Sequence, residues 1–579
     1  MRYSLLTETI PFYTPVEHIF YNRGIPVDEI EHYKNVSIED TYSPTLLENI
    51  REGVCLLAKH IGQKNKVGIL VDCDADGFTS SALLTNYLNF LYPSWVSNCV
   101  VHFFHQGKQH GLADSVSSIV QAGVKLIIVP DAGGGDSEYV EQLKEHNIET
   151  LIIDHHHTVL EECGSAVVIN NQLGQYPNTT LSGVGVVYKF CEYLDECLLI
   201  NLAPTFLDLV AVGCVADLMP LTNYETLYYI REGLKTINNP FIKAMVKEQE
   251  YSINKHGGLD PYSIGFYIAP FINATIRVGT LEEKEMLFNS MLDINKETLV
   301  ESGKRGHKGE QVLLVEEVCR VCANIKTRQT KLRDENLAII EKLIEERNLS
   351  DNKMIVVQLQ KELQMDKNIL GLIANILMDK YQRPILLLNE TEENDEPVWA
   401  GSVRNYKYNE IKDLRQFLAD MPQTLYAQGH ASAFGVSIPN KLFDSFMEET
   451  NKALENFDFS SMYRVDFIFD PDDEAEYFLQ IADLKQYYGT GFEEPYIAIK
   501  DIHIDSNNLQ LMSKDKNPTL KITLPNGVEI MKFKSSQEEY ENLLNTVIDI
   551  VGKCSVNVWM GRITPQVLTE DYEIKRMDF

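Results

Sequence analysis

Short apolar runs alternate with amphipathic segments over residues 66–217. The runs are rich in valine and isoleucine, whereas the segments between them, such as 80–91 and 137–146, repeat their apolar positions at helical spacing. Alternating strands and helices favour an α/β domain with a largely parallel, doubly wound sheet. Its strands are predicted at residues 67–71, 100–104, 125–129, 150–153 and 166–169.

A different pattern begins after Gly309. Residues 310–350 contain neither glycine nor proline, and Leu, Val and Ile recur among charges, which predicts a connector of one long helix or two end to end. A smaller α/β unit follows at 353–457, in which the acidic stretch 389–397 is predicted to be a solvated hairpin loop. From residue 462 onward β-forming residues dominate, and Asn526-Gly527 is a turn signal, so a small β-barrel is expected.

Acidic residues follow the first predicted strand at alternate positions. Asp72, Asp74 and Asp76 stand directly after the run 67–71, at the end of a strand where open α/β sheets bind ligands. Three carboxylates so close together would repel one another, and their pKa values would rise unless a cation lay between them. Oxygen ligands of this kind suit magnesium or manganese. The alternative interpretation is a solvated acidic turn.

Two later predicted strands are also followed by residues that can bind a metal ion. Asp131 follows the third predicted strand, and a run of three histidines follows the fourth. Imidazole nitrogens bind manganese well and calcium poorly. Asp217 ends an apolar, helix-like stretch and is either an exposed cap or a further ligand. Together these residues predict a two-cation phosphoesterase site at one edge of the sheet. The three histidines are His155, His156 and His157.

Composition and charge limit the remaining choices. The length of 579 residues suggests three or four domains, and 44% hydrophobic with 23% charged residues indicates a folded globular protein. A net charge of −32 disfavours nucleic acid as a partner at long range. No signal peptide or membrane span is recognisable, and the ten cysteines are expected to be reduced thiols, so a cytoplasmic protein without membrane contact is expected.

The motifs at the strand ends resemble those of the DHH phosphoesterase superfamily. Asp-x-Asp-x-Asp-Gly at 72–77, the strand-end Asp131, Asp-His-His at 154–156 and Ala-Asp at 216–217 are similar to its four motifs. Leu-Ser-Gly-Val-Gly at 181–185 and the stretch 268–277 are similar to the RecJ-type branch, the single-strand-specific exonucleases. Ile276 stands where that branch usually has a glycine before the arginine.

The second half of the chain carries the same resemblance. Gly-Ser-Val-Arg-Asn at 401–405 and Gln-Gly-His at 428–430 resemble motifs of the DHH-associated domain, with Gln428 in place of a glycine. Tyr-Gly-Thr-Gly-Phe at 488–492 resembles the start of the RecJ-type OB barrel. The resemblance implies an N-terminal extension packing on the DHH domain (1–60), a DHH catalytic domain (61–300), a connector helix (301–350), a DHH-associated domain (351–460) and an OB-type barrel (461–579).

Residue roles follow from the resemblance, position by position. It implies two divalent ions, with Mn²⁺ favoured over Mg²⁺, and His156, Asp131 and His157 as the catalytic residues, with Asp131 also bridging the ions. A terminal 5′-phosphate would be held by Arg277, Ser402, Arg404, Gly429 and His430. The metal ligands would be Asp72, Asp74, Asp76, Asp131, His155 and Asp217.

The function that the resemblance implies is a metal-dependent 5′→3′ exonuclease of single-stranded DNA, releasing 5′-mononucleotides in repair, recombination or replication. A DHH phosphodiesterase of short oligoribonucleotides or cyclic dinucleotides is the alternative, and a non-catalytic binding module is a third. The implied partners are a single strand with a 5′ end and, by family analogy, a helicase or single-strand-binding protein; a monomer is expected. Candidate base-stacking aromatics in the barrel, where core packing is the alternative role, are Tyr487, Tyr488, Phe492, Tyr496 and Trp559.

Overall fold

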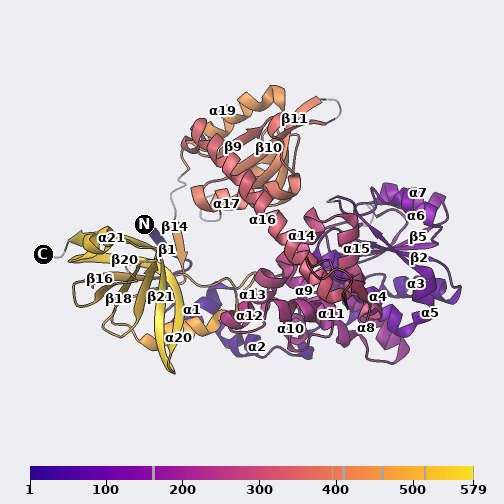
Figure 1. Ribbon diagram of the computed structural model, residues 1–579, viewed down its shortest axis with the longest axis horizontal. Coiled ribbons are helices and arrows are strands. Elements are labelled where there is room, and N and C mark those ends of the chain that lie inside the picture. Colours follow the sequence, from indigo (N-terminus) through magenta and orange to yellow (C-terminus); the bar gives the residue numbers. More distant parts are fainter. Residues whose placement is uncertain are drawn as a thin grey trace. The chain divides into compact units, whose positions relative to one another are not determined.

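The computed structural model contains two compact units (Figure 1). Unit 1 comprises Met1–Asn22, Arg328–Leu484 and Pro495–Phe579, and unit 2 comprises Arg23–Thr327 and Lys485–Glu494. Within the described residues, no helix is both long enough and apolar enough to cross a membrane. The structure describes residues 1–107, 109–159, 163–393, 396–406, 411–457, 462–513 and 517–577.

Unit 2 is built around a five-stranded sheet in which every neighbouring pair is parallel. The spatial order is β3-β2-β4-β5-β6, and all five strands lie where the apolar runs predicted them. The predicted parallel α/β domain is therefore confirmed. Its strands are β2 (Val67–Val71), β3 (Val100–Phe104), β4 (Leu126–Pro130), β5 (Glu149–Asp154) and β6 (Val167–Asn170).

The strand order creates a switch point between β2 and β4. Connections from β2 lead to β3 on one side, whereas all later strands are added on the other side of β2. At such a point two loops diverge and leave a crevice at the carboxyl ends of the strands. The crevice is flanked by Asp72, which follows β2, and by Asp131, which follows β4.

Helices cover the sheet and supply most of its core. The α6 (Val116–Ala122) and α7 (Ser137–Glu145) helices bury apolar side chains against β4 and β5. The α4 (Ala75–Leu91) and α8 (Gly183–Leu198) helices pack on each other and contact strands β2 and β5 respectively. All but the last three residues of α4 are buried, so the carboxylates at its start stand on a rigid base.

The predicted connector is a single helix, α16 (Leu314–Glu346), of 33 residues. At 1.5 Å per residue it is about 50 Å long. It is shorter than the predicted 301–350, because residues before it form the hairpin of β7 (Leu299–Glu301) and β8 (Gln311–Leu313). The boundary between the two units falls within α16, after Thr327.

Unit 1 contains the smaller α/β domain, whose five-stranded sheet has the order β12-β13-β11-β10-β9. The acidic stretch is not a loop: β10 and β11 continue through it, with Glu390 opposite Trp399 and Glu393 opposite Glu396. Antiparallel pairing bonds the backbone while the carboxylates stay solvated; Asn394 and Asp395 lie outside the described residues. The strands are β9 (Ile355–Leu359), β10 (Ile385–Glu393), β11 (Glu396–Arg404), β12 (Tyr426–His430) and β13 (Ala433–Pro439).

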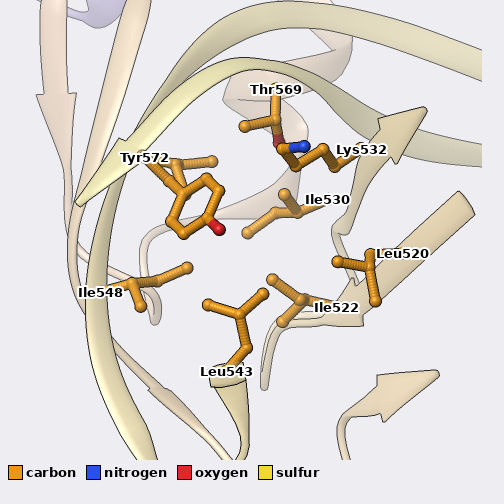
Figure 2. Close-up of a pocket in the computed structure, with 9 residues that line it drawn as sticks. Leu520, Ile522, Ile530, Lys532, Leu543, Ile548, Thr569 and Tyr572 are labelled. Carbon is orange, nitrogen blue, oxygen red and sulfur yellow. The ribbon is translucent and has the colours of Figure 1, made fainter. Parts of the chain in front are cut away.

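The C-terminal part of unit 1 is a curled sheet of seven strands, as the β-rich pattern predicted. Asn526-Gly527 makes the predicted turn between β18 and β19, with Gly527 at φ 88°. Side chains such as Leu520, Ile530 and Tyr572 point together into the interior (Figure 2). They leave only about 10 Å³, scarcely space for one water, so a ligand has no room inside. The strands are β15 (Phe467–Phe469), β16 (Ile497–Ile504), β17 (Leu509–Met512), β18 (Thr519–Thr523), β19 (Glu529–Phe533), β20 (Thr546–Trp559) and β21 (Arg562–Met577).

The N-terminal residues differ from the predicted extension 1–60. The β1 strand (Arg2–Leu5) pairs in parallel with β14 (Met462–Val465), and the Tyr3 hydroxyl donates to Asp549 Oδ2 at 2.9 Å. Residues Met1–Asn22 therefore belong to the unit that holds the barrel, and only the remainder of the extension belongs to unit 2. Local patterns do not reveal this pairing because its partners are more than 450 residues apart.

Candidate metal centre

The turn from β2 into α4 places the first three carboxylates. Asp74 is the N-cap of α4 and accepts a hydrogen bond from the Gly77 N–H at 3.0 Å. Gly77 is required by space, since a Cβ atom there would lie 2.6 Å from the Cβ of Asp72. The turn thus presents Asp72, Asp74 and Asp76 at alternate positions between the end of β2 and the start of α4, the strand end where the sequence predicted them.

Asp76 is held by the beginning of α8. Its carboxylate oxygens accept hydrogen bonds from the Gly183 N–H at 2.7 Å and the Val184 N–H at 3.1 Å. Free N–H groups at a helix N-terminus stabilise a negative charge. Even so, burial and the neighbouring charge of Asp74 raise the pKa of Asp76 to about 7. The helix end therefore offsets only part of the cost of burying this carboxylate.

Asp131 is buried, and its carboxylate finds no hydrogen-bond donor among the described residues. It adopts φ 64° at the end of β4, and both carboxylate oxygens are buried without a hydrogen bond among the described residues. Burial, followed by the charges of Asp76 and Asp74, raises its pKa well above the ordinary value. A Cβ atom on Gly183 would lie 2.1 Å from Asp131 Oδ1, so only glycine at the start of α8 permits this packing.

The His155 ring lies close to three of the carboxylates. Its Nε2 atom lies 3.3 Å from Asp131 Oδ1, 3.5 Å from Asp217 Oδ2 and 4.0 Å from Asp76 Oδ2. Desolvation lowers the pKa of His155 to about 4, so the ring is neutral and offers a lone pair. Asp217, at the end of α9 (Leu207–Ala216), is thus drawn into the cluster, and burial raises its pKa to about 8.

Asp154 organises the loop of three histidines. Its Oδ1 atom accepts hydrogen bonds from the His155 and His156 N–H groups and lies 2.8 Å from His156 Nδ1, while Oδ2 accepts from the Gly134 N–H. The hydrogen bond to Asp154 raises the pKa of His156 to about 9. His156 is therefore cationic at neutral pH, and its side chain is about half exposed. His157 lines the same hollow as His156.

Asp72 is engaged by residues outside the predicted motifs. His110 Nδ1 lies 2.5 Å from Asp72 Oδ2, the Gly111 N–H donates to Oδ1 at 3.1 Å, and His105 Nε2 lies 3.5 Å from Oδ1. Burial alone would raise the pKa of Asp72, but its interactions with His105 and His110 hold that pKa at about 2. The same hydrogen bond to Asp72 favours the protonated ring of His110 and raises the pKa of His110 to about 11.

The donor set fits divalent cations. Among the described residues, four overlapping groups have ligand atoms within 4.8 Å of one another: Asp72, Asp74 and Asp131; Asp76, His155 and Asp217; Asp131, His155 and His156; and Asp72, Cys73 and His110. The unsatisfied oxygens of Asp131 and the raised pKa values show that the cluster lacks positive charge. Oxygen donors with one neutral imidazole suit Mn²⁺ or Mg²⁺ better than Ca²⁺.

Comparison with known proteins agrees with this geometry. Residues 66–214 match the model of the DHH family N-terminal domain, and residues 465–571 match that of the RecJ OB domain. YorK of Bacillus subtilis (strain 168) bears the name of an SPbeta prophage-derived single-strand DNA-specific exonuclease. It is 33% identical to this chain over 598 residues, and the alignment covers 100% of this chain and 99% of YorK. This chain belongs to the RecJ-type DHH family.

More distant RecJ proteins share the fold. RecJ of Bacillus subtilis is 24% identical to this chain, and the alignment covers 98% of this chain and 69% of that RecJ. The crystal structure of Thermus thermophilus RecJ with Mn²⁺ superposes with a TM-score of 0.72 at 20% identity, covering 97% of this chain and 76% of that one. A Mg²⁺ complex of the same protein has a TM-score of 0.64 at 18% identity.

In this RecJ-type chain the structure adds His105 and His110, which sequence reasoning missed, and gives a role to Asp154 and Gly183, which lie in motifs named from the sequence. His105 and His110 hold Asp72, Asp154 holds His155 and His156, and Gly183 makes room for Asp131. A signal for the first pair was present, because His105 directly follows the predicted strand 100–104 and therefore stands at the same edge of the sheet. Gly183 lies in the Leu-Ser-Gly-Val-Gly stretch at 181–185, but nothing in the local pattern shows that it makes room for Asp131.

The residues expected to hold a 5′-phosphate fall in both units. Arg277, on α14 (Ala269–Val278), is in unit 2, where burial lowers its pKa and the charge of Asp74 opposes that shift. The other four gather at one end of the smaller sheet in unit 1: Arg404 and His430 both pair with Ala433. Those four residues are Ser402, Arg404, Gly429 and His430.

The candidate stacking aromatics separate into core and surface residues. Tyr488 and Phe492 are buried, and Phe492 stacks on Tyr33 within unit 2. Tyr487 packs beside the Arg231 guanidinium, and Tyr496 lies under the Lys553 ammonium. Trp559 is 70% exposed. Of the five, therefore, only Trp559 presents a largely exposed ring.

Proposed function

We propose that this protein is a divalent-metal-dependent 5′→3′ exonuclease that hydrolyses single-stranded DNA to 5′-mononucleotides. The observation that carries the proposal is the buried cluster at the switch point, in which Asp131 has two unsatisfied oxygens. A cluster so short of positive charge is suited to cations rather than to a protein nucleophile. The named activity of YorK, a relative along the whole chain, supports single-stranded DNA as the substrate.

Two cations, Mn²⁺ by preference or Mg²⁺, would be held by Asp72, Asp74, Asp76, Asp131, His155 and Asp217. Bound there, they supply an activated water and neutralise charge on the phosphoryl oxygens. Asp131 belongs to two of the ligand groups, one with Asp72 and Asp74 and one with His155 and His156, which suits a shared ligand. The Mn²⁺ and Mg²⁺ complexes of Thermus thermophilus RecJ support this choice of metals.

The remaining roles belong to the chain's own side chains. His156, oriented by Asp154 and cationic at neutral pH, donates a hydrogen bond to a non-bridging oxygen of the scissile phosphate. His157, on the same loop, supports it. For the terminal 5′-phosphate we propose Arg277 in unit 2 and, in unit 1, Arg404 together with Ser402, Gly429 and His430; an arginine offers phosphate oxygens a planar donor fork.

A strand-polarity assay tests the proposal. On a 40-nucleotide single strand labelled at its 5′ or its 3′ end, we expect mononucleotides to be released from the 5′ label first, with Mn²⁺ present and not with EDTA. A blunt duplex of the same sequence serves as the control and should persist. Release from the 3′ end, or equal attack on the duplex, would contradict the proposal.

A dinucleotide and a cyclic dinucleotide, added to the same assay, address the alternative activity on very short substrates. A curled OB-type sheet of the kind that binds extended strands argues for the long substrate. Cleavage of the dinucleotide alone would favour the alternative.

Arg404→Ala should weaken the preference for a 5′-phosphorylated end over a 5′-hydroxyl end by roughly tenfold or more, since a hydrogen bond to a charged group is worth about 1.5–3 kcal/mol. The measurement is the ratio of kcat/KM values for the two ends. Arg333→Ala is the matched control, because its guanidinium pairs with the neighbouring Asp334 on exposed α16. An unchanged ratio in Arg404→Ala would remove this residue from the phosphate site.

The cellular setting is proposed on family grounds. We place the protein in the cytoplasm, as a monomer acting in DNA repair, recombination or replication, with a helicase or single-strand-binding protein to supply its substrate. The division into five domains given above is proposed on the same grounds, with residues 1–22 reassigned to the barrel unit.

A further inference from the structure

A hollow of about 390 Å³ opens in unit 2 and is lined in part by residues near Asp217 in the chain. One wall is formed by Val215, Leu218 and Met219, the residues on either side of Asp217. The residues of this wall are therefore close sequence neighbours of a proposed metal ligand. Its volume is at the lower end of the range of small-ligand pockets.

The opposite wall carries a pair of stacked aromatic rings. Tyr262 and Phe266 have ring centroids 4.2 Å apart and planes inclined by 22°. Phe266 is 61% exposed although it is large and apolar. It lies on a π-helical segment, η6 (Ile264–Ile268), between α13 (Pro261–Ser263) and α14. Such interruptions of helices occur frequently at functional sites, and this one turns an aromatic face outward.

Leu218 adds a second irregularity. It follows Asp217 directly, adopts φ 59° and is 68% exposed. The left-handed region costs a non-glycine residue about 1–2 kcal/mol, and exposing a leucine adds to that cost. Leu218 thus presents an exposed apolar side chain directly after the proposed metal ligand Asp217.

The third wall determines the sign of the charge that the hollow accepts. It is formed by segment 488–494, which is tied down by the Leu221 N–H donating to Thr490 O at 2.8 Å. Glu493 and Glu494 lie on this wall, and none of the lining residues, all of them described, is basic, although Arg23, which does not line the hollow, has its Nε atom 3.8 Å from Glu493 Oε2. A phosphate group would be repelled here, whereas a flat, uncharged ring would be accommodated.

We infer that this hollow binds one nucleobase of the single strand, with the ring of Phe266 as its stacking platform and Leu218 packing at its edge. The inference rests on the proposed function and adds a subsite to it. Stacking on an aromatic face tolerates every base, because each base has a π-face. The subsite would hold the strand in register while its neighbouring phosphodiester lies at the carboxylates, and it would require a flexible, unpaired base.

The test is a double-mutant cycle between the protein and the DNA. Phe266→Ala is compared with the wild type on a 5′-phosphorylated dT₁₂ strand and on strands carrying one abasic site at position 1, 2, 3 or 4. Dissociation constants are measured by fluorescence anisotropy with Ca²⁺ in place of Mn²⁺, and kcat/KM with Mn²⁺. Tyr251→Ala, an 82% exposed tyrosine that does not line the hollow, is the matched control.

We expect Phe266→Ala to weaken binding of dT₁₂ about tenfold, and less than twofold when the abasic site occupies the coupled position. Tyr251→Ala should have no effect on either strand. Equal losses by Phe266→Ala on all five strands would overturn the base subsite while leaving the exonuclease proposal intact. A wild-type protein that binds no single strand would instead refute the proposed function itself.

Should Phe266→Ala unfold the protein, Phe266→Trp provides a second route. Tryptophan at this position retains the stacking surface, so binding is expected to persist and its emission should be quenched by dT₁₂. Quenching should be lost with the abasic site at the coupled position. Quenching that is the same for every strand would again overturn the inference.

Discussion

Asp131→Asn should lower Mn²⁺-dependent hydrolysis of single-stranded DNA by more than a hundredfold without unfolding the protein. Loss of a residue that merely orients a metal ligand costs about 10–100-fold, and a shared ligand should cost more. Because both oxygens of Asp131 are buried without a donor, removing its charge should leave the melting temperature of the metal-free protein unchanged or raised. The measurements are initial rates over a Mn²⁺ titration and thermal melting in EDTA.

The matched control for Asp131→Asn is Asp28→Asn, an exposed aspartate of the same unit. It should keep wild-type rates and wild-type metal dependence. Near-normal turnover by Asp131→Asn would remove the proposed centre. A large fall in its melting temperature in EDTA would show that Asp131 is a structural residue instead.

Metal-free protein should lose stability as pH rises from about 5 to 9. The folded pKa values of Asp76 and Asp217 are about 7 and 8, and that of Asp131 is also raised, against 3.8 for an unperturbed aspartate. In this pH window the folded state therefore binds more protons than the unfolded state does. For each extra proton bound, the free energy of unfolding falls by up to about 1.4 kcal/mol per pH unit. Asp72 and His155 shift the other way: the Asp72 pKa of about 2 places its effect below this window, whereas the lowered pKa of His155, about 4, opposes the trend only below its ordinary value of 6.5.

Saturating Mn²⁺ should reverse that trend. A cation competes with the protons on the same carboxylates, so its binding strengthens as pH rises. The gain in melting temperature on adding Mn²⁺ should therefore be small at pH 5 and large at pH 9, and Asp217→Asn should reduce both slopes. A metal-free stability that rises between pH 6 and 9, or a metal effect independent of pH, would contradict this description of the cluster.

Much of the centre could be predicted from local pattern. Apolar runs bounded by Asp and Gly located all five strands of the parallel sheet, and with parallel strands the residues that follow each strand must meet at one edge. The smaller sheet shows the limit of such reasoning. Composition favoured a loop at 389–397, yet β10 and β11 pair through it, because strand pairing depends on a partner that local composition does not specify.

The sequence by itself determined which residue types end each strand, and hence that carboxylates and His155 would share one edge of a sheet. Only the tertiary structure decided their partners and their environment. His110 reaches Asp72 across 38 residues, and the Gly183 N–H reaches Asp76 across 107. The physical reason is that a side chain's local pattern specifies its own strand or helix, whereas the lateral order of strands and the approach of a helix end arise from packing the whole domain.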